Sequence, residues 1–370
     1  MGCSFLKISA LFPVVLLALA PAAANGQSPL DSKGPIPLTA ATLALGDDSF
    51  VFTTFEPVPG AQGTYARKIN NRGQVIGSYY FQGKIRAFLR EADGSMVLIA
   101  PPDDPDYQQA YATGISESGQ VAGYYIDRSG GSPAGFIRSV GGIITTIRYP
   151  GPGTIPTEIL DMNAAGDVVG WYSGYDPWWG FLRHANGEFV SFGYPNAEYT
   201  IPMAINDRGQ VVGYFVIYPQ LIERPFLRER DGRLLAIGPP ALDASCRMYS
   251  VDINNFGQIV QSYFCATETG SNYRSYLREP DGKFVGIEFP GGVWTVAQGM
   301  NERGEIVGAY LTGQGYPQFL GFLRYADGTF SKIEHPEGFN FSWAFGINDR
   351  GQIVGVCSKG TGEGFVATRR

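Results

Sequence analysis

A motif of nine residues recurs along most of the chain, and this repeat limits the possible folds more than any other feature. It reads Ile-Asn-Asn-Arg-Gly-Gln-Val-Ile-Gly at residues 69–77 and Ile-Asn-Asp-Arg-Gly-Gln-Val-Val-Gly at residues 205–213. Seven copies are present, and successive copies are 43 to 48 residues apart. Their central glycines are Gly73, Gly119, Gly166, Gly209, Gly257, Gly304 and Gly351. A regular period of this length indicates that one supersecondary unit is repeated.

Each repeat is predicted to form four short strands. In the repeat of residues 289–334, the strands are expected over residues 294–300, 305–311, 321–325 and 329–333. Asn301 and Gly304 bound the turn between the first two strands, and Asp327-Gly328 forms the turn between the last two. The composition agrees, because 50 Gly, 25 Pro and 14% aromatic residues favour short strands and tight turns. Four strands in about 46 residues is the length of a propeller blade.

We therefore predict an all-β fold, a seven-bladed β-propeller of four-stranded blades. The two ends of the chain support a closed ring. The last repeat ends at Arg370, soon after its third strand, whereas residues 48–57 resemble an isolated fourth strand such as residues 281–290. If the N-terminal strand completes the last blade, no sheet edge is left exposed where the ring closes.

The first 24 residues have the layout of a cleaved secretory signal. Lys7 is their one charged residue, and an apolar run over residues 8–20 precedes Pro21 and three alanines. We expect a linker over residues 25–47 and the propeller over residues 48–370. No later stretch reaches about 18 uninterrupted apolar residues, so no membrane span is expected. The predicted product is secreted or periplasmic, and we expect it to be a monomer.

Signatures of nucleic-acid binding and of common enzymes are absent from the sequence. The chain has 28 Lys and Arg against 34 Asp and Glu, a formal net charge of −6, and no basic cluster, which argues against a nucleic-acid partner. His184 and His335 are the only two histidines, and neither has partners at the spacing of a zinc centre or a catalytic triad. No catalytic residue and no cofactor are therefore assigned.

Three cysteines lie beyond the predicted signal peptide. The turn from Asn254 to Gly257 places Cys246 opposite Cys265 on the first two strands of the fifth repeat, allowing one residue for a bulge. Export permits disulfides, so we predict a Cys246–Cys265 bond that staples the blade. Cys357 is expected to be a buried small hydrophobic residue.

The repeated motif also suggests a family. An Ile-Asn-x-x-Gly-x-Val-Val-Gly element that alternates with a Gly-Phe-Leu element resembles the extracellular HAF repeat family of bacterial exported proteins. The resemblance covers the chain from about Asp48, although the His-Ala-Phe triplet is replaced by Arg86-Ala87-Phe88 or by Gly180-Phe181 and Gly321-Phe322. It implies export and a repeated β architecture, and it carries no established activity.

The turn asparagines invite a choice between a metal ring and a structural role. Asn in the first and Gly in the fourth position are what such a turn needs for its own backbone, so we interpret them as turn caps. They are Asn70, Asn163, Asn206, Asn254, Asn301 and Asn348, with Ser116 in the second repeat.

Differences between the repeats indicate where a ligand would bind. The connections from the second to the third strand and from the fourth to the next first strand vary, and in a propeller they share one face. Aromatic residues in or beside these connections suit stacking on sugar rings or anchoring a protein. The candidate ligand-binding residues are Tyr175, Asp176, Trp178, Trp179, Tyr199, Trp294, Tyr316 and Trp343. Trp294, Trp343 and Tyr199 could instead fill gaps between blades.

Two positions before a turn asparagine, the innermost strands carry Lys68, Asp161 and Asp252, which are expected to line the central channel. We interpret them as a structural ion pair, with an acid-base or cation site as the alternative. The leading function is a secreted, non-catalytic binding propeller for a carbohydrate or for an envelope or host macromolecule. The alternative is a hydrolase or lyase of lactonase or glycosidase type, with Asp161, Asp176 and Asp252 at the channel mouth and Ca²⁺ as the candidate ion.

Overall fold

The structure is a computed structural model that describes residues 49–101, 107–127, 131–174, 177–218, 222–239, 245–267, 270–313, 318–335, 337–339, 341–358, 360 and 362–370. All of them belong to the compact unit that runs from Thr39 to Arg370. They form 28 β-strands and no helix, so the described chain contains no helix able to cross a membrane. The predicted signal peptide and linker lie outside the described residues.

Five of the six sheets have four antiparallel strands. One contains β10 (Thr157–Met162), β11 (Val168–Tyr172), β12 (Trp179–Arg183) and β13 (Phe189–Phe192). The next contains β14 (Tyr199–Ile205), β15 (Val211–Ile217), β16 (Ile222–Arg228) and β17 (Leu234–Ala236). It is followed by β18 (Cys246–Ile253), β19 (Ile259–Thr267), β20 (Gly270–Arg278) and β21 (Phe284–Gly286), and then by β22 (Gly292–Met300), β23 (Ile306–Thr312), β24 (Phe319–Arg324) and β25 (Phe330–Ile333).

The sixth sheet has eight strands, and its two halves repeat the same pattern. The first half contains β2 (Thr64–Ile69), β3 (Val75–Phe81), β4 (Lys84–Arg90) and β5 (Met96–Ile99). The second contains β6 (Gln109–Ile115), β7 (Val121–Ile126), β8 (Ala134–Arg138) and β9 (Ile144–Ile147). A single parallel residue pair, Ile85 with Gln109, joins the halves.

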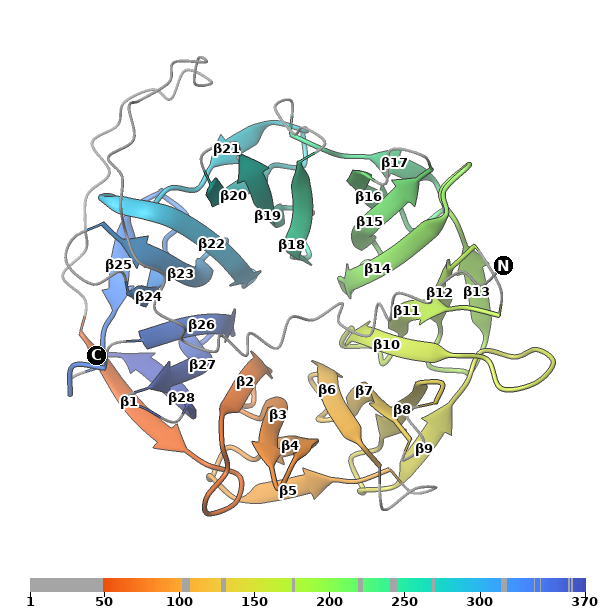
Figure 1. The fold of residues 1–370 in the computed structure, drawn as a ribbon, viewed down its shortest axis with the longest axis horizontal. Helices are drawn as coiled ribbons and strands as arrows, with labels where there is room; N and C mark the ends of the chain where they lie inside the picture. Colours follow the sequence, from red (N-terminus) through yellow and green to blue (C-terminus); the bar gives the residue numbers. More distant parts are fainter. Residues whose placement is uncertain are drawn as a thin grey trace. The chain divides into compact units, whose positions relative to one another are not determined.

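The N-terminal strand completes the C-terminal sheet, as the sequence predicts. This sheet has the order β1-β28-β27-β26, with β1 (Phe50–Phe55), β26 (Phe341–Ile347), β27 (Gln352–Ser358) and β28 (Gly362–Arg369). β1 is antiparallel to β28, in a register that runs from Phe50 with Arg369 to Phe55 with Gly364. Neighbouring sheets pack face to face along the chain, and β27 packs on β2, so the sheets of this unit form a ring (Figure 1). The fold is a β-propeller.

Hydrogen bonds of six turn asparagines link successive repeats, and only the step from Ser116 to Asn163 shows no such bond among the described residues. Asn348 accepts from the backbone N–H of Arg350 and of Gln352 through its Oδ1, which caps its own turn. Its Nδ2 donates to the Asn70 carbonyl across the point where the ring closes, at 2.9 Å. The same bond between repeats runs from Asn70 to Ser116, Asn163 to Asn206, Asn206 to Asn254, Asn254 to Asn301 and Asn301 to Asn348. The cap interpretation is confirmed, and the amide nitrogens add the bonds between repeats.

The last glycine of the motif allows a bulge in the innermost strand. In β2 the register shifts between Ala66 and Lys68, which leaves Arg67 as an extra residue. A Cβ on Gly77 of β3 would overlap the Tyr65 carbonyl oxygen, so this close approach requires glycine. Five further innermost strands bulge three residues before the turn residue, at Thr113, Leu160, Met203, Gln298 and Phe345.

The fifth repeat departs from this pattern for a steric reason. Gln261 occupies the position where the other repeats have glycine, and it pairs with Val251 in regular register. The bulge of β18 lies instead between Met248 and Ser250, so that Tyr249 is the extra residue. A side chain at position 261 excludes the close approach, and the bulge therefore moves two residues towards the start of the strand.

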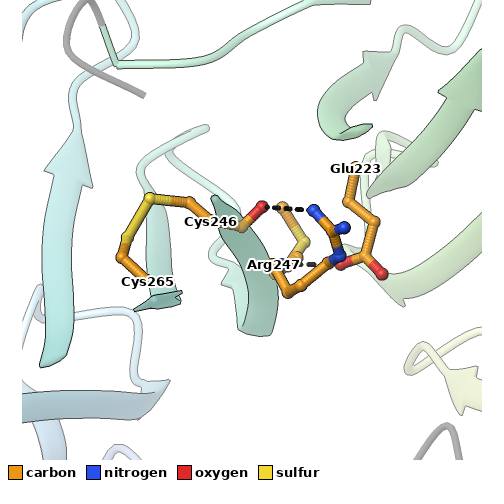
Figure 2. The surroundings of a disulfide bond; sticks show 5 residues. Glu223, Cys246, Arg247 and Cys265 are labelled. Carbon is orange, nitrogen blue, oxygen red and sulfur yellow. Dashed lines mark hydrogen bonds between the residues drawn. A yellow bond between two sulfur atoms is a disulfide. The ribbon is translucent and has the colours of Figure 1, made fainter. Parts of the chain in front are cut away.

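The predicted disulfide is present and joins β18 to β19. Cys246 and Cys265 are directly opposite and both buried (Figure 2). Beside the bond, Arg247 Nη1 donates to the Cys246 carbonyl at 3.2 Å, and Met248 N–H donates to Glu223 Oε2 at 2.7 Å. Cys357 is buried as expected, and burial raises the pKa of its thiol to about 12.

Replacing Asn348 with Ala should lower the free energy of unfolding by roughly 1–3 kcal/mol, because buried polar groups on both sides of the ring closure lose their partners. Urea unfolding of both proteins would measure this. Asn186→Ala is the control, since Asn186 makes a hydrogen bond only within an exposed turn. Equal losses for the two variants would contradict a special role for the closure.

Replacing both Cys246 and Cys265 with Ser should cost about 3 kcal/mol, because the bond closes a 19-residue separation in the unfolded chain. Thermal unfolding with and without reductant would measure the effect, and Cys357→Ser is the matched control for removal of a buried sulfur. A wild-type melting temperature that reductant leaves unchanged, with full reduction verified by thiol counting, would rule out stabilisation by the bond.

Candidate functional site

The first strand of each four-strand group lies nearest the centre of the ring (Figure 1). Each of these strands ends at an Asn-x-x-Gly or Ser-x-x-Gly turn, and we call the opposite end of the strands the loop end. The residues five positions before the turn residue are Tyr65, Tyr111, Glu158, Ile201, Tyr249, Val296 and Trp343. Aromatic and acidic side chains therefore gather towards the loop end.

Side chains meet across the centre of the ring. The rings of Tyr249 on β18 and Trp343 on β26 are 6.2 Å apart, although the sheet of β22 lies between their sheets. The Arg67 guanidinium carbon is 5.6 Å from the Phe345 ring centroid. Burial lowers the pKa of Arg67, and nearby tyrosines, Tyr124 foremost, oppose the shift. Aromatic side chains from different sheets thus gather near the Arg67 cation.

Glu158 is the acidic member of this layer. It lies on β10 directly opposite Trp171 of β11 and is half-buried. Burial raises the pKa of Glu158 to about 8, and the neighbouring Trp171 indole opposes part of the shift. The carboxyl also contributes to the raised pKa values of Tyr111, Tyr124 and Tyr214, for which burial is the main cause. Glu158 therefore carries a proton at neutral pH.

An aromatic stack leads outward from Glu158. The rings of Trp171 and Trp178 are stacked with centroids 4.5 Å apart, and Trp178 meets the edge of Tyr199 at 5.0 Å. A backbone bridge between Trp178 and Tyr199 holds the last two together. Trp179 follows and is 40% exposed. The stack thus extends from a residue opposite Glu158 to half-buried Trp178 and Tyr199.

Two indole N–H groups in this layer lack hydrogen-bond partners of good geometry within the described part of the chain. They belong to Trp171 and Trp343, whose side chains are only 5% and 4% exposed. A buried donor without a partner is costly, and such groups in native proteins commonly serve a ligand or a bound solvent molecule.

The predicted ligand-binding residues differ in how exposed they are. Trp179 is exposed, whereas Trp178, Tyr199 and Trp294 are half-buried. The interpretation of Trp343 as an exposed rim residue is wrong, and the alternative of a buried packing residue agrees with its contacts to Tyr249 and Phe319. Tyr175, Asp176 and Tyr316 lie outside the described residues.

The structure brings the predicted channel charges together, nearer the turns. Lys68 Nζ donates to Asp161 Oδ1 at 2.6 Å, and the net effect of both aspartates is to raise the pKa of Lys68 against burial. Asp161 also accepts from the backbone N–H of Met162 and of Ile205. These bonds tie β2, β10 and β14 to one another.

Asp252 has a similar environment. It accepts from the backbone N–H of Ile253 at 3.0 Å and of Met300 at 3.1 Å. Burial raises its pKa to about 6, with Lys68 opposing and Asp161 adding to the shift. Among the described residues, no group of three or more His, Cys, Asp or Glu side chains could hold a metal ion.

Reasoning from the sequence missed Glu158, Arg67, Tyr111 and Tyr249. A comparison of the seven repeats at the position five before the turn residue would have found all of them except Arg67. The residue at that position varies between aromatic, acidic and aliphatic types. Arg67 is the extra residue of a bulge, and its inward place follows from the glycine at position 77.

No protein-family model and no curated protein matches the chain. Among solved structures, the chain is similar to a virginiamycin B lyase from Staphylococcus aureus, with 13% identity and a TM-score of 0.57 over 86% of this chain and 99% of that one. It is also similar to an acylaminoacyl peptidase from Pyrococcus horikoshii, with 11% identity and a TM-score of 0.55 over 84% of this chain and 52% of that one.

A puromycin hydrolase is similar as well, with 14% identity and a TM-score of 0.53 over 80% of this chain and 50% of that one. These likenesses agree with the β-propeller described above. At identities of 11% to 14% they show the fold alone.

Replacing Glu158 with Gln should change how stability depends on pH. The folded protein holds the Glu158 proton up to about pH 8, whereas the unfolded chain releases it near the ordinary value of 4.5. Raising the pH through this window therefore destabilises the wild type relative to Glu158→Gln, by on the order of 4 kcal/mol between pH 5 and pH 9. Urea unfolding at pH 5 and pH 9 would measure the difference. Glu188→Gln, on an exposed turn of the same sheet, should show no such trend, and a pH-independent difference for Glu158→Gln would contradict the assignment.

Proposed function

We propose that this protein is an exported, non-catalytic binding propeller that engages a carbohydrate or an envelope or host macromolecule through the loop end of its ring. The observation that carries the proposal is the stack of Trp171, Trp178 and Tyr199 beside the half-buried Glu158 carboxyl, with exposed Trp179 next to it in sequence. Aromatic surfaces with a few polar groups at their centre are typical of ligand sites on rigid scaffolds.

The proposal includes a ring of seven blades. The 28 described strands divide into seven successive groups with the same pairing pattern, once β1 is counted with the C-terminal sheet. The eight-stranded sheet contains two such groups joined by the single pair of Ile85 with Gln109. A single pair of this kind is expected where two neighbouring blades touch each other.

Export and membership of the HAF repeat family belong to the same proposal. The buried Cys246–Cys265 disulfide is compatible with a secreted or periplasmic protein, because such bonds persist in oxidising compartments. The repeated Asn-x-x-Gly-x-Val-Val-Gly motif supports the family, and its role in the fold explains why it recurs: asparagine links the sheets and the last glycine permits the bulge.

Binding is favoured over catalysis by the state of the inner carboxylates. Asp161 and Asp252 are occupied by Lys68 and by backbone N–H groups, so neither is placed to act on a substrate. A hydrolase or lyase of lactonase or glycosidase type is the second candidate. It is favoured by Glu158, whose pKa of about 8 suits a general acid.

The proposal predicts that replacing Trp178 and Trp179 together with Ala lowers affinity at least tenfold for any ligand of the loop end, because aromatic contacts of this kind contribute about 1 kcal/mol each. A glycan array followed by calorimetry on its best hit would measure this, with melting temperatures to verify folding. Phe256→Ala is the matched control, since Phe256 is 60% exposed within a turn at the opposite end of the inner strands. The proposal would be contradicted if the protein were not retained on glycans or envelope extracts, or if Phe256→Ala lost as much affinity as the double variant.

A further inference from the structure

We propose that Glu158 and the Trp171 indole N–H form the polar centre of a site for an uncharged, polyhydroxylated ligand, such as a neutral oligosaccharide, at the loop end of the ring. This inference rests on the proposed binding function and names its ligand class.

The arrangement pairs a hydrogen-bonding centre with an aromatic surface. Glu158 and Trp171 are directly opposite on β10 and β11, so their side chains lie on the same face of the sheet. The Trp171 ring continues into Trp178 and Tyr199 through contacts of 4.5 and 5.0 Å. A sugar offers the two matching elements, hydroxyl groups that donate and accept hydrogen bonds and an apolar ring face that stacks on aromatic side chains.

The buried indole of Trp171 points independently to a ligand. Trp171 is only 5% exposed, and its N–H makes no hydrogen bond of good geometry among the described residues, although the Glu158 carboxyl lies close enough to interact with it. A ligand hydroxyl placed between this N–H and the Glu158 carboxyl could accept from the indole. The same hydroxyl could donate to the carboxyl, which would satisfy both groups.

The surroundings of Glu158 select against charged ligands. Tyr111 on β6, Tyr124 on β7 and Tyr214 on β15 are the titratable groups that interact with it, and all three are buried. The desolvated carboxyl keeps its proton at neutral pH, so it offers no negative charge to an ammonium group.

Two charged groups lie one step further away. The Arg67 cation interacts with Tyr111 and Tyr124, and the Glu223 carboxyl interacts with Tyr214. Arg67 adds to the disadvantage of a cationic ligand. The burial that raises the pKa of Glu158 also makes it costly to remove the carboxylate of an anionic ligand from water, so a neutral polyol is the best match.

Calorimetry at pH 6 with three sets of hexasaccharides tests the inference. The neutral set contains cellohexaose, xylohexaose and N-acetylchitohexaose, the cationic probe is chitosan hexamer, and the anionic probe is hexagalacturonate. We expect binding within the neutral set and at least tenfold weaker binding of both charged probes.

Variants then test the two polar groups. Glu158→Ala should weaken binding of the neutral ligand at least tenfold, whereas Glu158→Gln should stay within about threefold at pH 6, because an amide also donates and accepts. Trp171→Phe keeps an aromatic ring and removes the N–H, and it should lower the affinity about threefold to tenfold. Glu188→Gln is the matched control on the same sheet and should leave the affinity unchanged.

The pH dependence supplies a readout that a purely structural role would not move. Wild-type affinity for the neutral ligand should fall at least threefold between pH 6 and pH 9, and the affinity of Glu158→Gln should stay constant. Tighter binding of a charged probe, equal pH profiles for the two proteins, or binding unaffected by Glu158→Ala would each overturn the inference.

The failures of the two proposals are distinguishable. Binding of a charged sugar or a protein that is lost in the Trp178→Ala/Trp179→Ala variant would retain the binding function and overturn the neutral ligand class. If none of the probes binds while the glycan array finds another loop-end ligand, the neutral class is again overturned alone. If nothing binds at the loop end, both proposals fail.

Discussion

Closure of the ring is the constraint on which the rest of the structure depends. β1 adds the outer strand of the C-terminal sheet, and Asn348 Nδ2 bonds the Asn70 carbonyl between residues 278 positions apart in the chain. Closure matters because a β-sheet with an unpaired edge invites aggregation, and because the starts of the inner strands share one end only in a ring. The same amide that caps a local turn thus fixes long-range geometry, which explains why a turn residue recurs so regularly.

The last glycine of the motif controls what faces the centre. Where this glycine is present, as at Gly77 and Gly355, the backbone of the inner strand lies close to the second strand. The inner strand then has a bulge, in which Arg67 or Phe345 is the extra residue. Where Gln261 replaces it, the bulge moves and the extra residue is Tyr249. One substitution in the repeat therefore changes which side chain reaches across the ring to Trp343. The repeat makes a uniform scaffold, and departures from it make the centre specific.

Much of the fold could be read from the sequence because it depends on local rules. The missing fourth strand of the last repeat predicts the β1–β28 pair, and strand pairing counted outward from a turn predicts the Cys246–Cys265 bond. The centre was harder to predict. The position two before the turn identified Lys68, Asp161 and Asp252, but the bulges lie just beyond it, and a two-residue period counted across a bulge assigns side chains to the wrong face. The sequence left open whether Trp343 lies at the rim or fills a gap between blades, because its burial depends on Tyr249 from a different repeat.

The inner strands carry two layers of polar groups that differ in how fully they are satisfied. Near the turns, Lys68, Asp161 and Asp252 bond to one another or to backbone N–H groups of neighbouring sheets, so this layer stabilises the ring. Near the loop end, a protonated carboxyl at Glu158 adjoins an indole N–H without a partner of good geometry. A protein that needed only to hold its ring closed would gain stability from an apolar residue at position 158, as Ile201 and Val296 occupy the equivalent positions in two other repeats. Glu158 and the Trp171 N–H interact, but without a well-aligned hydrogen bond, and a ligand that bonds to both groups is a simple physical reason for a polar pair at this place.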